Sequence, residues 1–323
     1  MTDLQSQDRV EIPSNRTIVC TKWGKKPKQQ AREAPLTVSV KPGTVLVNVK
    51  AACLSALDVQ LCRGYLKRKV AKSTPHGLGY DFSGVVTHTS TSQGKFKVGD
   101  AVFGCLPLNQ PGALSDHILV DESWCALKPE SLSHDTAASL GWNCLLANAA
   151  LRDLHVSLDD RVLVLGGTSS TGHLLIQLAK ELFEVEWVAT TSTHQDRGFC
   201  EGCGADEVFD YQASKTTHWA APFLKTHSYD VILDCVNDPL SFKLLRRGGR
   251  QRTLLTGEQP PALFSFSCKP PAELPEPDGE VLERIAVLAV LEKIRPNVVT
   301  AKFPEAAETF LTTLPRLLVI QFD

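Results

Sequence analysis

A short run of glycines and small hydroxyl residues is the part of this sequence best suited to bind a phosphorylated ligand. Branched aliphatic residues precede it at 162–165, and leucines at helical spacing follow it. A strand, a tight loop and a helix in that order point backbone N–H groups and the positive end of a helix dipole at a pyrophosphate. The predicted binding residues are Gly166, Gly167, Thr168, Ser169, Ser170, Thr171 and Gly172.

The loop departs from the strictest dinucleotide-binding pattern. Ser169 and Ser170 stand where that pattern places glycine. The small hydroxyl residues at 168–171 are expected to cap the helix that follows. Taken alone, the loop is compatible with a nucleotide site and with a structural turn between a strand and a helix.

The next apolar run, residues 186–193, ends in small hydroxyl residues and has no acidic residue at its tip. An acidic residue there would bind a ribose 2′-OH and select NAD. Ser192, followed by Arg197, instead leaves room for a 2′-phosphate and for a cation to hold it. We therefore predict NADPH as the cofactor, with Ser192, Arg197 and Tyr211 around the 2′-phosphate and the adenosine. The alternative is that Arg197 is an ordinary solvated helix residue.

A third apolar run at 231–236 completes three alternations of strand and helix, which is typical of a doubly wound parallel sheet. Cys235 and Val236 end this run and are expected to border the dinucleotide. Helix is predicted again at 239–249, and from Gly279. Earlier in the chain, short strand-like runs separated by turn residues between 10 and 49 predict an antiparallel, partly barrel-like domain.

Composition excludes several classes of function. The chain has 323 residues, enough for two domains, and a formal charge of −2, which offers no electrostatic case for nucleic-acid binding. No apolar run approaches the ~18 to 20 residues of a membrane span, and the first residues lack the apolar core of a secretion signal. We expect a cytoplasmic protein whose ten cysteines are reduced. Cys200 and Cys203 form a C-x-x-C without the second pair that a zinc site needs.

Three further segments carry a family resemblance. They are GYDFSGVV at 79–86, KVGDAVFG at 97–104 and PGALSDHILVD at 111–121. Together with the glycine loop they resemble the medium-chain dehydrogenase/reductase superfamily. The resemblance is to its zinc-independent branch of quinone oxidoreductases and enoyl reductases, including the reticulon-interacting oxidoreductase type.

The resemblance implies a two-domain α/β protein. Residues 1–135 and 280–323 would form a GroES-like, partly barrel β-rich catalytic domain. Residues 136–279 would form a Rossmann-type dinucleotide-binding domain, a doubly wound parallel sheet whose C-terminal part is shortened or degenerate. Residues 259–278 are rich in proline, whereas the family often places a strand and a helix of its dimer edge there. The family resemblance is compatible with a homodimer.

The resemblance also bears on metal and catalysis. Zinc-dependent members carry a cysteine ligand where Ser55 stands and a His-Glu pair where Tyr80 and Asp81 stand, so no metal site is predicted. Ser55 takes the place of an asparagine that often lines the nicotinamide pocket. Tyr65 matches a tyrosine placed to donate a proton, although it follows Gly64 about one position earlier than usual; the alternative is a surface or packing role.

The resulting hypothesis is a zinc-independent, NADPH-dependent reductase that delivers a hydride to a quinone or an α,β-unsaturated carbonyl compound. The alternative is a catalytically degenerate NADPH-binding protein with a regulatory or partner-binding role. Its support is the serines of the loop, the displaced Tyr65, and Leu146 where the family usually carries a threonine. Neither hypothesis includes a nucleic-acid partner or a membrane span.

Overall fold

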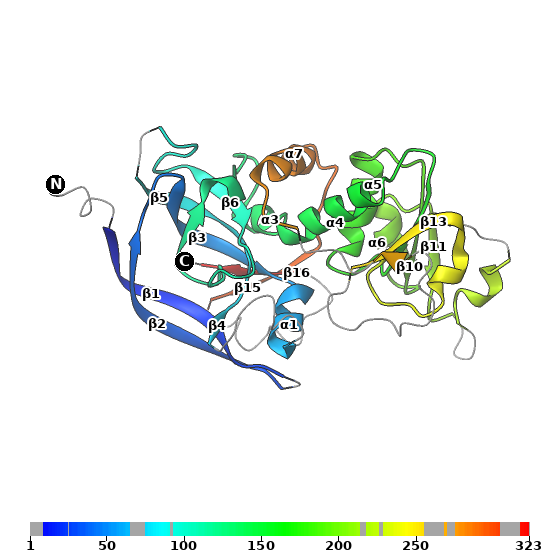
Figure 1. Ribbon diagram of the computed structural model, residues 1–323, viewed down its shortest axis with the longest axis horizontal. Coiled ribbons are helices and arrows are strands. Elements are labelled where there is room, and N and C mark those ends of the chain that lie inside the picture. Colours follow the sequence, from blue (N-terminus) through cyan, green and yellow to red (C-terminus); the bar gives the residue numbers. More distant parts are fainter. Residues whose placement is uncertain are drawn as a thin grey trace. The chain divides into compact units, whose positions relative to one another are not determined.

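The computed structural model describes residues 9–24, 26–64, 75–90, 93–213, 218–225, 229–254, 268–269, 275–303 and 317–322 (Figure 1). The chain forms two compact units. Met1–Trp142, Glu276–Val290 and Val298–Asp323 make up the first, here called the β-rich unit. Asn143–Pro275 and Leu291–Asn297 make up the second, here called the α/β unit.

The α/β unit is built on a six-stranded sheet with the order β11-β10-β9-β12-β13-β14. All neighbouring strands are parallel. The order reverses between β9 and β12, which creates a switch point at the carboxyl ends of these two strands. The predicted doubly wound parallel sheet is therefore confirmed. The strands are β9 (Arg161–Leu165), β10 (Trp187–Ser192), β11 (Glu207–Asp210), β12 (Tyr229–Asp234), β13 (Leu245–Thr253) and β14 (Cys268–Lys269).

Side-chain burial explains why these segments form strands and helices. The four aliphatic residues of β9 and all six residues of β12 are buried, as expected for central parallel strands covered on both faces. Helix α5 (Gly172–Glu181) packs against β9 and β10 through its predicted leucine stripe. Helices α4 (Trp142–Asp153) and α6 (Arg197–Gly202) complete the regular α-helices between these strands. An apolar cluster around Leu163, Tyr229 and Ile232 forms part of the core.

The β-rich unit contains two sheets. The larger has the order β15-β16-β3-β5-β6-β8, with β7 also paired to β3. The smaller has the order β2-β1-β4. All pairings are antiparallel except that of β15 with β16, which confirms the antiparallel character predicted for the first strands. The strands are β1 (Arg9–Lys22), β2 (Lys28–Ser39), β3 (Thr44–Leu54), β4 (His76–Gly77), β5 (Asp81–Thr89), β6 (Ala101–Cys105), β7 (His117–Asp121), β8 (Cys125–Leu127), β15 (Val298–Lys302) and β16 (Leu317–Gln321).

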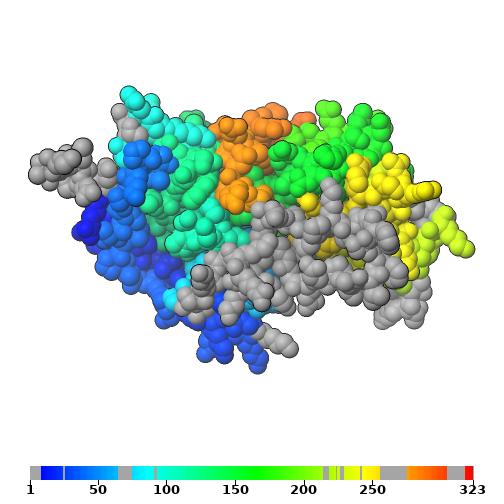
Figure 2. Space-filling model, in the orientation of Figure 1, coloured from blue at the N-terminus to red at the C-terminus, as the bar shows by residue number. Residues whose placement is uncertain are grey.

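The described part of this unit also contains helices. They are α1 (Ala56–Arg63), α3 (His134–Ala138), α7 (Gly279–Val290) and the 3-10 turn η1 (Glu122–Trp124). Strand β16 joins the sheet beside β3, so the last described strand completes a sheet begun near the start of the chain. Strand β2 is exposed along most of its length, and Figure 2 shows the β1–β2 hairpin in blue on the surface.

One predicted helix is wrong. Residues 239–249 form the short 3-10 turn η3 (Ser241–Leu244) followed by β13, not an α-helix. Gly248 and Gly249 lower helix propensity, and Gly248 adopts a φ of 80°. Pairing with the buried strand β12 supplies the backbone hydrogen bonds instead. A second 3-10 turn, η2 (Ala221–Phe223), precedes β12. The predicted helix from Gly279 is present as α7, and most of the proline-rich segment 259–278 lies outside the described residues.

Within the described part of the chain, no helix combines the length and apolar character needed to cross a membrane.

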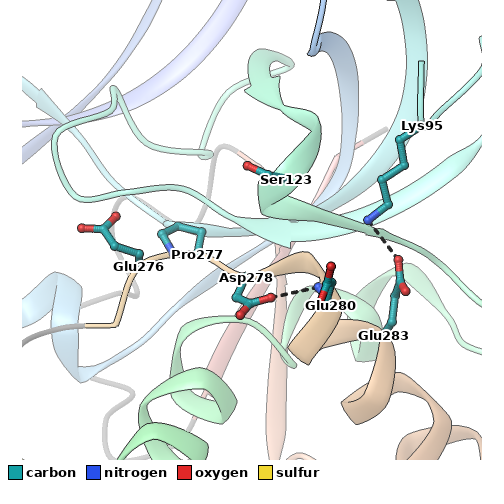
Figure 3. Close-up of a pocket in the computed structure, with 7 residues that line it drawn as sticks. All are labelled: Lys95, Ser123, Glu276, Pro277, Asp278, Glu280 and Glu283. Atoms are coloured by element: carbon teal, nitrogen blue, oxygen red, sulfur yellow. Dashed lines mark hydrogen bonds and ion pairs between the residues drawn. The ribbon is translucent and has the colours of Figure 1, made fainter. Parts of the chain in front are cut away.

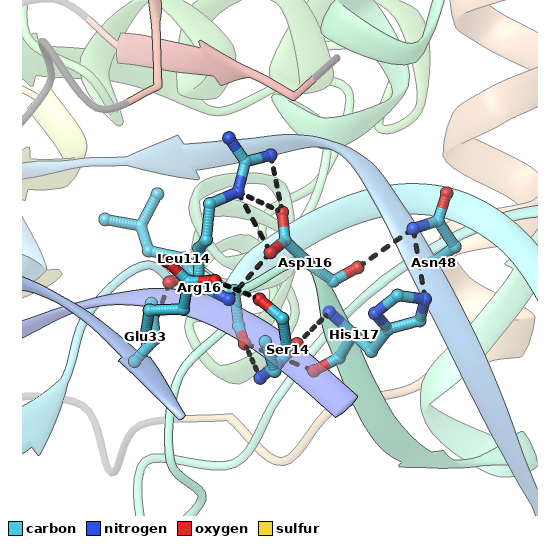
Figure 4. A network of polar contacts seen from close by, with 10 residues as sticks. Ser14, Arg16, Glu33, Asn48, Leu114, Asp116 and His117 are labelled. Carbon is cyan, nitrogen blue, oxygen red and sulfur yellow. Dashed lines mark hydrogen bonds and ion pairs between the residues drawn. The ribbon is translucent and has the colours of Figure 1, made fainter. Parts of the chain in front are cut away.

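A polar network joins the two sheets of the β-rich unit (Figure 4). Asp116 accepts the Arg16 backbone N–H at 2.7 Å and the Arg16 Nη2 at 2.9 Å. Asn15 donates to Ser115 Oγ at 2.7 Å and accepts the His117 N–H at 2.8 Å. An isolated bridge between Thr17 and Ser115 lies beside these bonds. Hydrogen bonds of side chains therefore supply much of the contact between the two sheets.

We predict that Asp116→Ala lowers the free energy of unfolding by about 2 to 3 kcal/mol, because it removes the charge-assisted bonds between this carboxylate and the half-buried Arg16. The control is Glu11→Ala in β1, the strand that carries Arg16; it removes an exposed ion pair with Arg9 and is expected to cost less than about 1 kcal/mol. Urea unfolding of the two variants measures the difference. Equal losses would contradict the proposed role of the network.

Candidate functional site

The turn that follows β9 depends on glycine. Gly166 has a φ of 82°, and its N–H donates to Thr191 Oγ1 at 2.9 Å. The Gly167 N–H donates to the Thr191 carbonyl at 3.0 Å. A Cβ on Gly167 would overlap Thr190 Oγ1, and a Cβ on Gly172 would overlap the Gly166 carbonyl. The backbone of the loop therefore lies directly against β10 and against the start of α5, an approach that no other residue type permits.

Ser169 caps the helix. Its Oγ accepts the Gly172 N–H at 3.0 Å, as the prediction of a capping hydroxyl required. Thr171 occupies the N-cap position but makes no capping bond. Its hydroxyl instead donates to Asn143 Oδ1 at 2.8 Å. The serine that departs from the glycine pattern thus satisfies a helix-terminal donor that would otherwise face the space above the loop.

The predicted loop residues divide into two groups by exposure. Gly166, Thr168 and Ser169 are partly exposed. The others are buried, and they are Gly167, Ser170, Thr171 and Gly172. The partly exposed residues lie in the first half of the loop, at the carboxyl end of β9.

The buried His173 side chain fixes the first turn of α5. Its Nδ1 lies 2.8 Å from the Ser169 carbonyl, and its Nε2 accepts the Asn297 N–H at 3.0 Å. The proton of the neutral ring therefore belongs on Nδ1. Burial lowers the pKa of His173 to about 4. Gln177, one turn later, accepts the Arg295 N–H at 2.6 Å, so segment 291–297 braces the helix. Sequence reasoning did not identify either residue.

The structure places Cys235 and Val236, which are predicted to border the dinucleotide, next to the glycine loop. The Cys235 N–H donates to the Leu165 carbonyl at 3.1 Å, and a Cβ on Gly166 would meet Val236 Cγ1 first. Val236 is 49% exposed, an unusual degree for a large apolar side chain, whereas Cys235 is buried. An apolar side chain thus lies open beside the glycine turn at the switch point of the sheet.

Asp234 holds this second turn in place. Its carboxylate accepts the N–H groups of Val236, Asn237 and Asp238 at 2.9, 2.8 and 2.9 Å. Burial raises the pKa of Asp234 to about 6, although these three bonds oppose the shift. Sequence reasoning missed Asp234; an acidic residue ending a buried strand was the available signal.

The residues predicted for the 2′-phosphate lie at the ends of β10 and β11. The Tyr211 N–H donates to the Ser192 carbonyl at 3.1 Å, so these two residues are neighbours. The Ser192 hydroxyl is buried and donates to the Thr193 carbonyl, whereas Tyr211 is 47% exposed. Arg197 donates to the Val208 carbonyl at 2.7 Å and pairs with Glu201 at 3.5 Å. Its guanidinium thus lies beside β11 while staying partly open to solvent.

In the β-rich unit, Ser55 serves as the cap of α1. Its Oγ accepts the Leu57 N–H at 3.2 Å, and its own N–H donates to Asp58 at 3.0 Å. Asp58 also accepts the Gly79 N–H at 2.7 Å, and burial raises the pKa of Asp58 to about 6. Ser55 is buried in this arrangement. Tyr65, the other predicted catalytic residue, lies outside the described residues.

Tyr80 and Asp81 are committed to partners within the unit. The buried Tyr80 hydroxyl hydrogen-bonds His76 Nε2 at 2.5 Å. Asp81 accepts the Trp142 N–H at 2.6 Å, and burial raises the pKa of Asp81 well above its usual range. Among the described residues, no group of three or more His, Cys, Asp or Glu side chains is arranged to hold a metal ion.

An acidic hollow of about 620 Å³ lies in the β-rich unit (Figure 3). Lys95 Nζ pairs with Glu283 at 2.9 Å and donates to the Cys125 carbonyl, while Asp278 accepts the Glu280 N–H at the start of α7. Its carboxylates thus cap a helix or pair with lysine, and they would repel an anionic nucleotide. The lining residues are Lys95, Ser123, Glu276, Pro277, Asp278, Glu280 and Glu283.

Comparison with known proteins gives a consistent result. Residues 41–130 match the family model "Alcohol dehydrogenase GroES-like domain". A 2-methylene-furan-3-one reductase from Solanum lycopersicum is 31% identical over 266 residues, which is 80% of this chain and 65% of the relative. A chloroplastic NADPH-dependent alkenal/one oxidoreductase from Arabidopsis thaliana is 29% identical with the same coverage. The chain thus spans slightly less than two thirds of the length of these relatives.

Solved structures show the same fold. A quinone oxidoreductase from Coxiella burnetii aligns with a TM-score of 0.79 at 23% identity, covering 96% of this chain and all of that one. The CurK enoyl reductase aligns with a TM-score of 0.78 at 20% identity, covering 96% and 99%. A cobalt- and zinc-bound alcohol dehydrogenase from Pyrobaculum aerophilum aligns equally well, with a TM-score of 0.79 at 19% identity, 96% and 100% covered. Because a metal-bound protein shares this fold, the fold alone does not decide whether a metal ion takes part.

We predict that Gly172→Ala lowers the free energy of unfolding by about 2 to 3 kcal/mol, because its Cβ overlaps backbone that cannot move without opening the turn. The matched control is Gly198→Ala in α6, where a Cβ meets nothing within 4 Å. That substitution is expected to stabilise the helix by up to about 1 kcal/mol. Thermal unfolding of both variants separates local overlap from a general effect of replacing glycine.

The environment of His173 predicts a dependence on pH. Because the folded state holds the ring neutral, stability contributed by this group is present above the unfolded pKa of about 6.5 and is lost as the pH falls toward 4. The loss amounts to about 3 kcal/mol. We expect the unfolding free energy of wild type minus that of His173→Gln to fall over this interval in urea titrations. The titrations of Asp58 and Asp234 contribute equally to both proteins and cancel in this difference. A difference that does not change with pH would refute the lowered pKa of His173.

Proposed function

We propose that the chain is an NADPH-dependent reductase of quinones or α,β-unsaturated carbonyl compounds and a member of the medium-chain dehydrogenase/reductase superfamily. The observation that carries the proposal is the glycine turn at the switch point between β9 and β12. In open parallel sheets this is the position where dinucleotides bind.

The residues of this turn fit a dinucleotide. A side chain at Gly166 would meet Val236 at the switch point, and its absence leaves the backbone there free to approach a pyrophosphate. Helix α5 directs the positive end of its dipole at the same place. The side chain of Asn143 accepts the Thr171 hydroxyl through Oδ1. Its amide nitrogen Nδ2 is buried, and the described residues provide no acceptor for it. A phosphate or amide oxygen near the loop would give it one.

NADPH is the proposed form of the cofactor. No acidic residue ends β10, so nothing at Ser192 or Thr193 would repel a 2′-phosphate. Arg197 and the exposed Tyr211 lie at this edge, and the Arabidopsis relative is named for its dependence on NADPH. The bond from Arg197 to the Val208 carbonyl orients the guanidinium without neutralising its charge.

The proposed substrates follow from the names of two relatives, a 2-methylene-furan-3-one reductase and an alkenal/one oxidoreductase, each of which indicates a conjugated carbonyl compound. Bound reduced nicotinamide would supply the hydride. The chain's own contribution is then to place the substrate against the dinucleotide and to exclude water. Val236 offers an apolar surface beside the glycine turn for this purpose.

We propose that a metal ion takes no part. The three positions where zinc-dependent members carry ligands hold Ser55, Tyr80 and Asp81, a poor donor set for zinc. Each is also engaged in the structure, by the α1 cap, by His76 and by the Trp142 N–H. Tyr65 is retained as the proposed proton donor on the sequence alone.

The test is a fluorescence titration of the purified protein with NADPH and with NADH, followed by turnover assays with a simple quinone and a 2-alkenal. We expect NADPH to bind at least about tenfold more tightly than NADH, since a guanidinium–phosphate contact contributes about 1.5 kcal/mol or more. Binding without turnover would favour the degenerate, non-catalytic alternative. Absence of binding at millimolar concentration would make the loop a structural turn.

Arg197→Glu sharpens this test. It is expected to weaken NADPH binding by about tenfold to a hundredfold while changing NADH binding little, because it replaces the cation by a charge that repels the 2′-phosphate. Glu201→Gln is the matched control, since it removes the competing partner of Arg197 and should leave NADPH binding unchanged or tighter. Equal effects of Arg197→Glu on the two nucleotides would remove Arg197 from the site.

A further inference from the structure

Two buried thiols from distant parts of the chain meet in the β-rich unit. Cys20 lies near the end of β1, and Cys62 lies in the last turn of α1. Their side chains lie close enough to shift each other's pKa, and Cys20 Sγ also donates to the Lys22 carbonyl at 3.4 Å. Both residues are 0% exposed, and both are free thiols. The backbone holds the two segments together as well, because the Gly24 N–H donates to the Cys62 carbonyl at 3.0 Å.

Gln29 borders this pair on the solvent side. It is the partner of Cys20 in the β1–β2 ladder, and its amide donates to Cys62 Sγ at 3.9 Å. Gln29 itself is partly exposed. On the opposite strand, β4, the partner of Cys20 is the buried His76. Among the described residues, Gln29 is thus a partly exposed side chain in contact with Cys62 Sγ, and its displacement would uncover this sulfur.

The surroundings make the two thiols unequal. The hydrogen bond with Cys62 lowers the pKa of Cys20. The same hydrogen bond and then burial raise the pKa of Cys62, and the nearby Asp58 carboxylate adds to that rise. The other groups that face the pair are His76 and Tyr80, which are bonded to each other. Cys20 is thus the thiol that ionises more readily, beside a second thiol that keeps its proton.

We propose that Cys20 and Cys62 form an oxidisable dithiol, a site that closes to a disulfide when the protein meets hydrogen peroxide. The Cys20 thiolate attacks one peroxide oxygen, and the O–O bond breaks. The hydroxide that leaves takes up the proton that Cys20 lost on ionisation and becomes the first water. Cys62 then attacks the resulting sulfenic sulfur, loses its proton, and releases the second water. Two thiols are oxidised by two electrons, and one peroxide is reduced to two waters.

The bond would tie the end of β1 to the last turn of α1. That helix begins at the Ser55 cap, and its Asp58 carboxylate holds the Gly79 N–H. Oxidation would therefore restrict motion in the segment that carries Ser55, which stands where the family often has an asparagine that lines the nicotinamide pocket. This is a modification of the chain itself, and its detection requires neither cofactor nor turnover, so its failure would be distinct from failure of the proposed function.

The experiment is non-reducing peptide mapping of the reduced wild-type protein after treatment with equimolar hydrogen peroxide and alkylation of the remaining thiols. We expect two of the ten thiols to be lost. Peptide 17–22 should be linked to peptide 51–63, with fragment spectra placing the bond at Cys62 and not at Cys53. Dithiothreitol should reverse the link, and the oxidised protein should melt at a higher temperature.

Variants then test each part. Cys20→Ser and Cys62→Ser should each abolish the link, and Gln29→Ala should accelerate its formation severalfold. Cys203→Ser is the matched control, because it disrupts the C-x-x-C pair at the end of α6, where burial raises the pKa of both thiols. It should leave the link intact. A wild-type map that shows another pair, or Cys20 overoxidised beside a free Cys62, would overturn the proposal even where a variant fails to fold.

Discussion

The close approach of backbone to backbone around Gly167 and Gly172 is the constraint on which the α/β unit depends. Because neither position has room for a Cβ, the loop after β9 can lie against β10 on one side and begin α5 on the other. The hydroxyl and carbonyl of Thr191 fix the turn through its two glycine N–H groups. The position of α5 on the sheet depends on this contact, since a bulkier turn would separate the helix from the sheet.

The second turn at the switch point is fixed by a different means. Asp234 replaces a close backbone contact by three charge-assisted hydrogen bonds from the residues that follow it. The carboxylate is buried in making these bonds. Burial disfavours its charged form, and this raises its pKa. One turn thus relies on the absence of side chains and the other on a single ionisable side chain. Between them they leave Val236 exposed.

Local patterns were enough to predict the fold but not the environment of the site. Apolar runs, the leucine stripe and the glycine loop identified β9, α5, β10 and β12, because burial on both faces requires those compositions. The helix expected at 239–249 failed, because pairing with β12 outweighs the helical preference of its leucines. The contact between His173 and Asn297 joins residues 124 positions apart, and no local pattern encodes it. Likewise, the sequence predicted that the Ser192 hydroxyl lies near the 2′-phosphate, but no local pattern indicated that Ser192 is buried.

The pairing of β16 with β3 has a consequence for how the chain is made. Strand β3 emerges early from the ribosome, yet its edge beside Leu54 stays unpaired until Leu318 has been synthesised. The α/β sheet, whose central strands lie between 161 and 253, has all of these strands available well before then. An open apolar strand edge must therefore wait until β16 has been synthesised. For this protein, the interval between those two events is the period of greatest exposure to misassociation and to chaperones.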